Sequence, residues 1–373
     1  MKVFSRLATV ACLAALSSVL SPDTASAQTK ELRYSLYLPP RSVEGGVVPP
    51  FLEELSKRTN GRVTGRLFPG GQLFSGPATL KGIRDGGADM GFIVLPLTLG
   101  ELKHANIGVD LQLHATDPLV AAGAVNETLM QSCAECKQDF ATQNSVYLGG
   151  HAAPPWYVMC KAPAKSLADM KGRKIRVTGA WAARLAIALG MVPVQLPGTE
   201  IASALSGGQI DCAVSPVVWL KDLQLWDSAK YVFEQPLGPS AGLGLFVTNR
   251  KTYDSLQAGD KEILLELVAK YSVRAIDAYL AHDATVRKEA AGKKVSFVKV
   301  GPDFVQAVDN FRKNDLPNVI NDMTTRGATN AQAIVQAHLA NIKTWEAIVA
   351  EVKGDREKYT QVMKERTMKG LAR

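Results

Sequence analysis

The chain has 373 residues, of which 46% are hydrophobic and 21% charged, and its formal net charge is +8. This length is enough for two lobes of ordinary size, each with its own buried core. A basic balance is typical of proteins that bind nucleic acid or anionic lipid, but here the charges are spread along the chain. That spread favours a small anionic ligand.

The N-terminus has the pattern of an export signal. Lys2 and Arg6 precede an apolar run over residues 7–20, and Ala25-Ser26-Ala27 follows as a small-residue cleavage site. We therefore predict a signal peptide over residues 1–27, cleaved after Ala27, and export argues against a nucleic-acid partner. A transmembrane helix is the alternative, but the run is too short to span a bilayer. A lipidated Cys12 is also disfavoured, because the apolar run continues past it.

The first half of the mature chain alternates between strand and helix patterns. Pro49 and Pro50 open a predicted helix that stops at Asn60-Gly61, where glycine suits the helix end. Residues 89–95 form an almost wholly apolar run, which is typical of a strand buried in a parallel sheet. The predicted elements of this half are strands at 32–38, 62–68 and 89–95, and helices at 49–60 and 77–85.

Four cysteines follow the signal peptide: Cys133, Cys136, Cys160 and Cys212. The spacing of Cys133 and Cys136 suits a redox dithiol or half of a metal site. A zinc site needs a second ligand pair, however, and residues 129–140 have the pattern of a helix, so structural cysteines are favoured. Cysteines of an exported protein can form disulfides, and the sequence leaves their pairing open.

The strand and helix alternation restarts at Trp156. Strands are predicted at 156–160, 174–177, 210–214 and 244–248, and helices at 181–189 and 201–205. Residues 261–291 then carry an apolar stripe at helical spacing, on a helix long enough to brace both lobes. The tail from Asn330 is also helical by pattern, with His338 and Trp345 on its apolar stripe. The economical architecture is two α/β lobes joined by crossing strands, with a ligand in the crevice at the strand carboxyl ends.

Catalytic interpretations find little support. Residues 238–242 fit the G-x-S-x-G pattern of a nucleophile elbow, but that elbow needs a helix directly after the serine, and residues 243–248 are strand-like. His104, His114 and His151 do not stand at metal-ligand spacing, and no phosphate-binding loop is present. We therefore predict no catalytic residue, no metal ligand and no cofactor, and a binding protein rather than an enzyme.

Several segments, in order along the chain, resemble the periplasmic substrate-binding subunits of tripartite ATP-independent (TRAP) transporters, the DctP-like proteins. The resemblance extends over residues 31–345 and is most recognisable at residues 166–177, which end in Lys174-Ile175-Arg176-Val177. Its other parts are the loop at 68–73, the turn at 86–90, residues 188–190 with Pro193-Val194, and then Glu200, Ala204-Leu205, Gly208 and Ile210-Asp211.

The resemblance implies a periplasmic binding protein-like fold whose two lobes close on an organic acid. It also implies a partner, a TRAP permease in the membrane driven by a sodium or proton gradient, without membrane insertion of this chain itself. Arg176 matches the family's arginine whose guanidinium pairs with the ligand carboxylate. The chemistry agrees, because a guanidinium is planar, always charged and donates two parallel hydrogen bonds to a carboxylate.

Three positions depart from the sialic-acid-binding members of that family. Trp156 stands where they have a second arginine, Ser215 where they have an asparagine, and Val94 where they have a glutamate. Hydroxyl groups of a sugar acid would therefore be desolvated without partners. An apolar or aromatic monocarboxylate, or a 2-oxo acid, is the better match.

Further pocket positions are expected around this site. The first lobe would contribute Tyr37 and the loop with Gln72 and Ser75, and the second lobe would add Trp181 and Trp219 as aromatic wall. Ordinary core packing is the alternative for Tyr37 and for each tryptophan.

The predicted division of the chain is a signal peptide over 1–27, lobe I over 28–153 with 241–285, lobe II over 154–240 with 286–345, and a C-terminal helical extension over 346–373. Two other functions stay open on the sequence alone. One is a sensory protein that presents the same clamp to a membrane receptor, and the other is an exported enzyme on the same fold.

Overall fold

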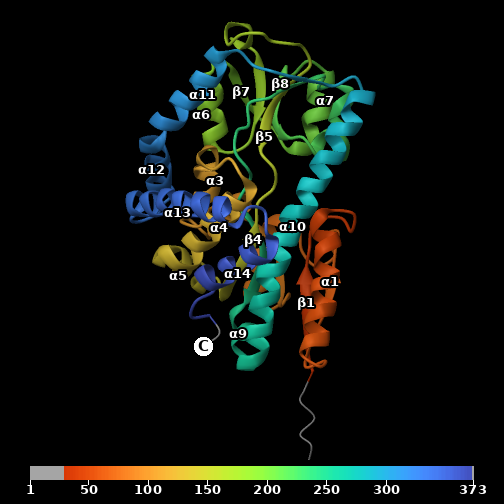
Figure 1. Ribbon diagram of the computed structural model, residues 1–373, viewed down its shortest axis with the longest axis vertical. Coiled ribbons are helices and arrows are strands. Elements are labelled where there is room, and N and C mark those ends of the chain that lie inside the picture. The colour runs from red at the N-terminus through yellow and green to blue at the C-terminus, as the bar shows by residue number, and fades with distance from the viewer. Residues whose placement is uncertain (1–28, 372–373) are drawn as a thin grey trace, which may run out of the picture.

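Two β-sheets organise residues 29–371, the part of the chain that this computed structural model describes. The first sheet, in lobe I, has the strand order β2 (Val63–Phe68), β1 (Lys30–Ser35), β3 (Met90–Val94), β10 (Leu243–Asn249) and β4 (Ser145–His151). The second, in lobe II, has the order β11 (Ser296–Val298), β9 (Tyr231–Phe233), β5 (Trp156–Cys160), β8 (Cys212–Pro216), β6 (Lys174–Val177) and β7 (Val192–Gln195). Figure 1 shows the second sheet at the top and the first at the bottom.

The chain crosses between the sheets on adjacent segments. It leaves lobe I after β4 and enters lobe II at β5, and it returns between β9 and β10. Pro155 and Pro239 form a β-bridge that joins these two connections, and the backbone N–H of Ala153 donates to the carbonyl of Ser240 at 2.9 Å. The predicted class, two α/β lobes joined by crossing strands, is confirmed.

Helices cover both sheets. Those of lobe I are α1 (Val43–Arg58), α2 (Gly76–Arg84), α3 (Ile107–Asp110), α4 (Pro118–Glu127), α5 (Ala134–Thr142) and α9 (Arg250–Asp254), and those of lobe II are α6 (Ala180–Ala188), α7 (Ile201–Ser206) and α8 (Trp219–Asp222). Single turns complete them: η1 (Leu95–Thr98), η2 (Gln112–His114), the π-helical η3 (Thr128–Ser132), η4 (Ala168–Met170), η5 (Gly198–Glu200) and η6 (Leu225–Asp227).

Helix α1 starts earlier than predicted. The sequence placed its first residues at Pro49 and Pro50, but both prolines lie inside the helix. Ser42 is its N-cap, and its hydroxyl accepts a hydrogen bond from the backbone N–H of Gly45 at 3.0 Å. The cap stabilises a first turn ahead of the prolines, and the buried Val47 and Val48 pack this turn into the core.

Helix α10 (Ala258–Gly292) is the long bracing helix that the sequence predicted. It packs on α1 and β4 of lobe I and on α8 of lobe II, and Figure 1 shows it running from one lobe to the other. Polar contacts hold its second half to lobe II: Lys221 Nζ forms an ion pair with Glu289 Oε1 at 2.8 Å, and His282 Nε2 lies 2.9 Å from Asp222 Oδ1.

The C-terminal helices return toward lobe I. After α11 (Pro302–Asn314), which packs on α6 of lobe II, come α12 (Leu316–Thr325), α13 (Ala331–Val352) and α14 (Arg356–Thr367). Helix α13 packs on α4, and its Trp345 is buried in the lobe I core. From the sequence, residues 286–345 were assigned to lobe II and residues 346–373 to a C-terminal extension. We propose a division in which lobe II ends near α11 and residues 331–371 belong to lobe I.

The four cysteines form two disulfides, Cys133–Cys136 in lobe I and Cys160–Cys212 in lobe II. The second joins directly paired residues of β5 and β8. Cys133 also ends the helix that was predicted over residues 129–140: it is the N-cap of α5, and its sulfur accepts from the backbone N–H of Cys136 at 2.9 Å. The Cys133–Cys136 disulfide thus stabilises the N-terminus of α5.

His338 is a packed histidine, as the apolar stripe predicted. It is buried on α13, and its Nδ1 lies 2.9 Å from the Thr128 hydroxyl. Burial lowers the pKa of His338 from 6.5 to about 3. The folded protein therefore binds this proton less readily than the unfolded chain does.

This shift predicts a loss of stability on acidification. The contribution of His338 is fully present above pH 6.5 and falls as the pH drops from 6.5 toward 3, by about 2–3 kcal/mol between pH 6.5 and pH 4.5. Denaturant unfolding at both pH values should therefore show a shallower pH dependence in His338→Gln than in the unmodified protein. Equal slopes in the two proteins would contradict the assignment.

Within residues 29–371, no helix combines the length and the apolar character that a membrane span requires. The predicted signal peptide over 1–27 lies outside the described residues.

Candidate functional site

Arg176 is a buried arginine on β6, near the carboxyl end of that strand. Its neighbours Ile175 and Val177 point into the core on one face of the lobe II sheet, so Arg176 points to the other face. Nε donates to the carbonyl of Leu196 at 2.9 Å, and Nη1 donates to the carbonyl of Val214 at 3.1 Å. Nη2 makes no hydrogen bond with a described residue, so it retains its donor capacity.

Within the part of the chain that the structure describes, no acidic side chain balances this guanidinium. Several partly buried arginines of the described chain have carboxylate partners, such as Arg184 with Asp315 and Arg326 with Asp110. Arg176 is only 3% exposed and has no such partner within residues 29–371, and desolvation lowers its pKa to about 10. A buried unpaired charge is costly. An anionic ligand would remove that cost.

Trp219 lies against the guanidinium, and Trp156 and Trp181 follow it in a row of rings. The Arg176 Cζ atom lies 5.5 Å from the ring centroid of Trp219, a distance typical of a cation–π contact. The Trp156 centroid lies 5.7 Å from that of Trp219 and 6.5 Å from that of Trp181. Trp181 is buried, whereas Trp156 and Trp219 are partly exposed. Trp156 and Trp219 therefore present partly exposed aromatic surface near Arg176, whereas Trp181 packs in the lobe II core.

Ser215 lies on the same face of the sheet as Arg176. Arg176 pairs with Ala213 on β8, and Ser215 follows two residues later, so its side chain has the same direction. It is fully buried, and its hydroxyl has no partner among the described residues. Strand β8 runs from Cys212 to Pro216, two residues later than predicted, and this register places Ser215 inside the strand.

Tyr37 follows β1 at the corresponding edge of lobe I. Its ring stacks on Phe92 with 5.8 Å between the centroids, and its side chain stays partly exposed. The Tyr37 hydroxyl makes no hydrogen bond with a described residue and is not fully enclosed. Burial and the nearby Glu44 carboxylate raise the pKa of Tyr37 far above its usual value, so the phenol keeps its proton.

Gln72 and Ser75 lie in the loop between β2 and α2, and both are exposed. Backbone bonds attach this loop to the segment after β1: Gly71 N–H donates to the carbonyl of Leu36 at 3.1 Å, and Gly70 N–H donates to that of Leu38 at 2.8 Å. Ser75 is the N-cap of α2 without a side-chain cap bond. The loop is thus attached to the Tyr37 segment, and among the described residues neither side chain forms a hydrogen bond with another predicted site residue.

A buried polar cluster that was not predicted from the sequence lies behind Tyr37. Glu44 at the start of α1, His151 at the end of β4 and Tyr279 in the middle of α10 meet there. The Tyr279 hydroxyl donates to Glu44 Oε1 at 2.9 Å, and His151 Nε2 lies 3.3 Å from the same oxygen. These residues are up to 235 positions apart in the chain, and their single polar positions resemble ordinary helix and strand residues.

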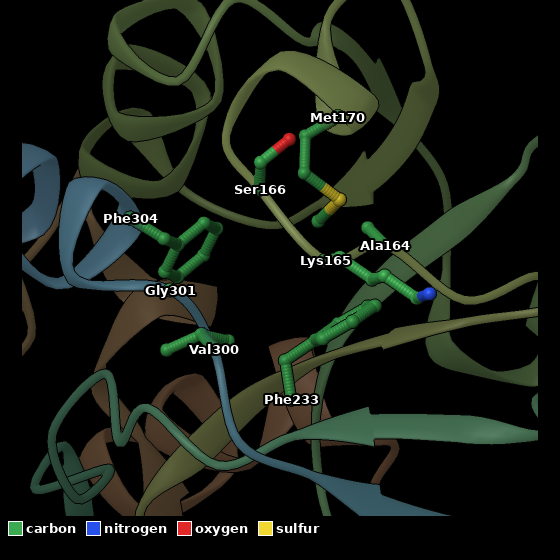
Figure 2. Close-up of a pocket in the computed structure, with 8 residues that line it drawn as sticks. All are labelled: Ala164, Lys165, Ser166, Met170, Phe233, Val300, Gly301 and Phe304. Carbon is green, nitrogen blue, oxygen red and sulfur yellow. The ribbon is translucent and has the colours of Figure 1, made fainter.

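A cavity of about 10 Å³ opens elsewhere in lobe II, between residues 164–170, Phe233 and the start of α11 (Figure 2). It holds about one water molecule. The cavity is therefore too small for an organic acid. None of the eight predicted site residues lines it, so it also lies away from the predicted site.

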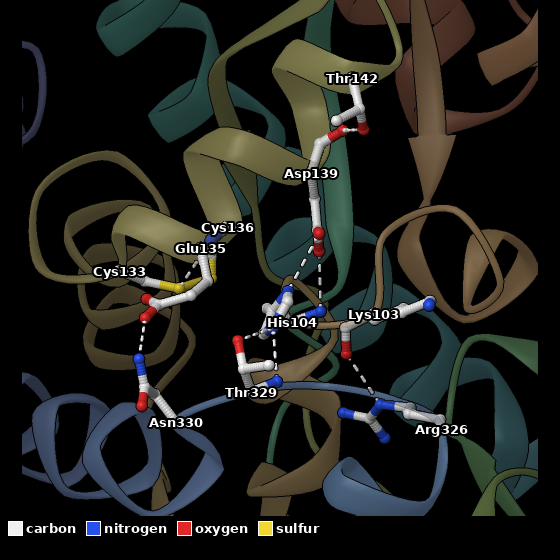
Figure 3. A network of polar contacts seen from close by, with 10 residues as sticks. All are labelled: Lys103, His104, Cys133, Glu135, Cys136, Asp139, Thr142, Arg326, Thr329 and Asn330. Carbon is white, nitrogen blue, oxygen red and sulfur yellow. Dashed lines mark hydrogen bonds and ion pairs between the residues drawn. A yellow bond between two sulfur atoms is a disulfide. The ribbon is translucent and has the colours of Figure 1, made fainter.

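His104 belongs to a structural polar network (Figure 3). Its Nδ1 lies 2.9 Å from Asp139 Oδ1, and its Nε2 accepts from the backbone N–H of Thr329 at 2.9 Å. Because both ring nitrogens are occupied, His104 anchors the α12–α13 connection to lobe I. Among residues 29–371, no group of three or more His, Cys, Asp or Glu side chains is arranged to hold a metal ion.

Comparison with known proteins gives a consistent result. The family described as bacterial extracellular solute-binding protein, family 7 (DctP), matches residues 34–322. A solute-binding protein from Albidiferax ferrireducens is 24% identical over 290 residues, which is 75% of this chain and 84% of that protein.

Two solved structures are also similar. A TRAP periplasmic solute binding protein from Desulfovibrio salexigens has a TM-score of 0.73 and 22% identity, over 85% of this chain and 97% of that one. Another from Bordetella bronchiseptica, with bound (R)- and (S)-mandelate, has a TM-score of 0.66 and 26% identity, over 84% and 99% of the two chains.

Proposed function

Because the chain belongs to family 7 of the bacterial extracellular solute-binding proteins, the receptors of TRAP transporters, we propose that it captures an organic monocarboxylate through Arg176. Members of this family are periplasmic, non-enzymatic receptors that bind a small solute and work with TRAP membrane components. The observation that carries the proposal is the burial of the Arg176 guanidinium without an acidic partner among the described residues. A ligand carboxylate would supply the missing charge.

The ligand of this proposal is an aromatic or apolar monocarboxylate, or a 2-oxo acid. Trp156 and Trp219 offer partly exposed aromatic surface next to the guanidinium, on which a planar group can stack. The related protein from Bordetella bronchiseptica binds mandelate, an aromatic acid with one carboxylate. Ser215, whose hydroxyl has no hydrogen-bond partner within residues 29–371, would hydrogen-bond the carboxylate or a 2-oxo group.

The proposed mechanism is closure of the two lobes around the acid. Arg176, the three tryptophans and Ser215 lie in lobe II, and Tyr37, Gln72 and Ser75 lie in lobe I. The two crossings beside Pro155 and Pro239 would act as the hinge. A ligand that contacts both lobes favours the closed state by its difference in affinity for the two states. The closed complex would then deliver the acid to the TRAP permease.

The mature protein in this proposal starts at Gln28. N-terminal sequencing of the exported protein tests the cleavage after Ala27, and a different first residue would refute that site.

Trp156→Arg should shift the ligand preference from monocarboxylates toward dicarboxylates by about 10-fold, because a second guanidinium would pair with a second carboxylate. Competition calorimetry with matched mono- and dicarboxylates measures the ratio of affinities. Unchanged selectivity in a folded Trp156→Arg protein would remove Trp156 from the pocket.

Thermal shifts test the proposed function directly. The mature protein is unfolded to release bound ligand, refolded, and heated with a panel of organic acids and with their neutral amides. A ligand that binds only the folded state raises the melting temperature. A rise with acids that is absent with the amides supports the proposal, and equal shifts with acids and amides would overturn the arginine–carboxylate pairing.

A further inference from the structure

A column of four stacked rings leads from the site edge of lobe I into its interior. Tyr37 stacks on Phe92, Phe92 on His151 at 6.1 Å between centroids, and His151 on Tyr279 at 5.6 Å. The interplanar angles are 17°, 24° and 21°, so the rings are nearly parallel. Such a stack fixes the position of the Tyr37 ring, and therefore of its hydroxyl.

The interior end of this column is polar and incompletely bonded. Glu44 and His151 are fully buried, yet Glu44 Oε2 and His151 Nδ1 lack hydrogen-bond partners among the described residues. The 3.3 Å contact between His151 Nε2 and Glu44 Oε1 does not have the geometry of a hydrogen bond. Glu44 Oε1 does accept a hydrogen bond from the Tyr279 hydroxyl. Burial and this carboxylate raise the pKa of Tyr279 strongly. Buried polar groups without partners are costly and are retained where they have a role.

The inner end of the column is linked to lobe II through α10. His282, three residues after Tyr279 on α10, lies 2.9 Å from the carboxylate of Asp222, which ends helix α8. Helix α8 begins with Trp219, the residue that contacts the Arg176 guanidinium. The ring column and the surroundings of Arg176 are therefore connected through α10 and the short helix α8.

We propose that the Tyr37 hydroxyl, held in place by the ring column, binds an uncharged hydroxyl group on the part of the ligand away from its carboxylate. The inference rests on the proposed function and narrows its ligand to hydroxylated monocarboxylic acids, aromatic ones above all. Tyr37 is the contact residue, and Glu44 is a positioning residue that sets the potential at this end of the site.

The charges explain why a hydroxyl fits and a second carboxylate does not. The protonated Tyr37 phenol can donate to a ligand hydroxyl or accept from it. The field of the Glu44 carboxylate, which already raises the pKa of Tyr37, favours a ligand hydrogen that points toward this end. A second ligand carboxylate would face a like charge in a partly desolvated site, which is unfavourable. Arg176 and Glu44 thus give the site a cationic and an acidic end.

The test compares benzoate, 3-hydroxybenzoate, 3-methoxybenzoate and isophthalate, and the same series built on phenylacetate, by calorimetry. We expect the hydroxylated acid to bind about 3- to 10-fold tighter than its parent. The methoxy and dicarboxylate forms should lose this advantage. In Tyr37→Phe the ratio between hydroxylated and parent acid should fall to about one.

Tyr147→Phe is the matched control, because the Tyr147 hydroxyl donates to Asn126 Oδ1 at 2.7 Å inside lobe I and should leave the hydroxyl preference intact. Glu44→Gln, checked for folding by circular dichroism, should improve binding of isophthalate relative to benzoate. Monocarboxylates that bind without hydroxyl preference, or a preference that survives in Tyr37→Phe, would overturn this inference alone. If no acid of the panel binds, the proposed function fails with it.

Discussion

Arg176→Ala is expected to abolish measurable binding of carboxylate ligands, with a loss of at least about 100-fold in affinity. The guanidinium is the one buried cation without an acidic partner in the described chain, so its removal takes away the charge that the ligand neutralises. The ligand-free variant should melt no lower than the unmodified protein, because a costly buried charge is lost. Calorimetry for binding and a thermal melt for folding measure the two effects.

Two further variants sharpen this experiment. Arg176→Lys keeps the charge but loses the planar fork, and should retain a small part of the affinity. Lys174→Ala is the matched control, since Lys174 lies two residues earlier on β6 with an exposed side chain. Unchanged affinity in Arg176→Ala, or an equal loss in Lys174→Ala, would refute the assignment of the carboxylate to Arg176.

The second large effect concerns the disulfides. Removing Cys160–Cys212, which spans 52 residues, should lower the free energy of unfolding by about 4 kcal/mol through the entropy of the unfolded chain. Removing Cys133–Cys136, which spans three residues, should cost about half of that, about 2 kcal/mol. The double variants Cys160→Ala/Cys212→Ala and Cys133→Ala/Cys136→Ala measure both values in denaturant titrations.

The comparison also tests the role of the lobe II bridge. It joins β5 to β8, the strands that carry Trp156 and Ser215, so its loss should weaken ligand binding as well as stability. The lobe I bridge caps α5, and its loss should leave binding nearly unchanged. Equal costs of the two removals would contradict the dependence on loop length.

The sequence predicted the fold well where local pattern decides it. Strands β5 and β6 have the bounds that their apolar alternation indicated, and the stripe over residues 261–291 matches α10 closely. The pattern failed where the chain makes distant contacts. The two prolines led to a predicted start of α1 at Pro49, whereas the Ser42 cap and packing against the core place the start of the helix at Val43. Helix α13 packs on α4 of lobe I because of its apolar stripe, and periodicity alone cannot tell which partner such a stripe meets.

The candidate site shows the same limit. Arg176, Trp156, Trp219 and Trp181 stand within one stretch of lobe II, and a family pattern was enough to group them as a prediction. Glu44, His151 and Tyr279 come from three distant segments, and no spacing links them. Only their stacking and their missing hydrogen bonds draw attention to them.

The form of helix α10 has a mechanical consequence. Its 35 residues make a rod of about 50 Å. Between Gly259 and Gly292 it contains no glycine or proline, the residues at which helices commonly kink. One end of the helix packs on α1, and the other is held to α8 by an ion pair. A closing motion of the two lobes must therefore either bend α10 gently along its length or slide one lobe against it. Elastic curvature would return the empty clamp to its open form without any chemical energy source.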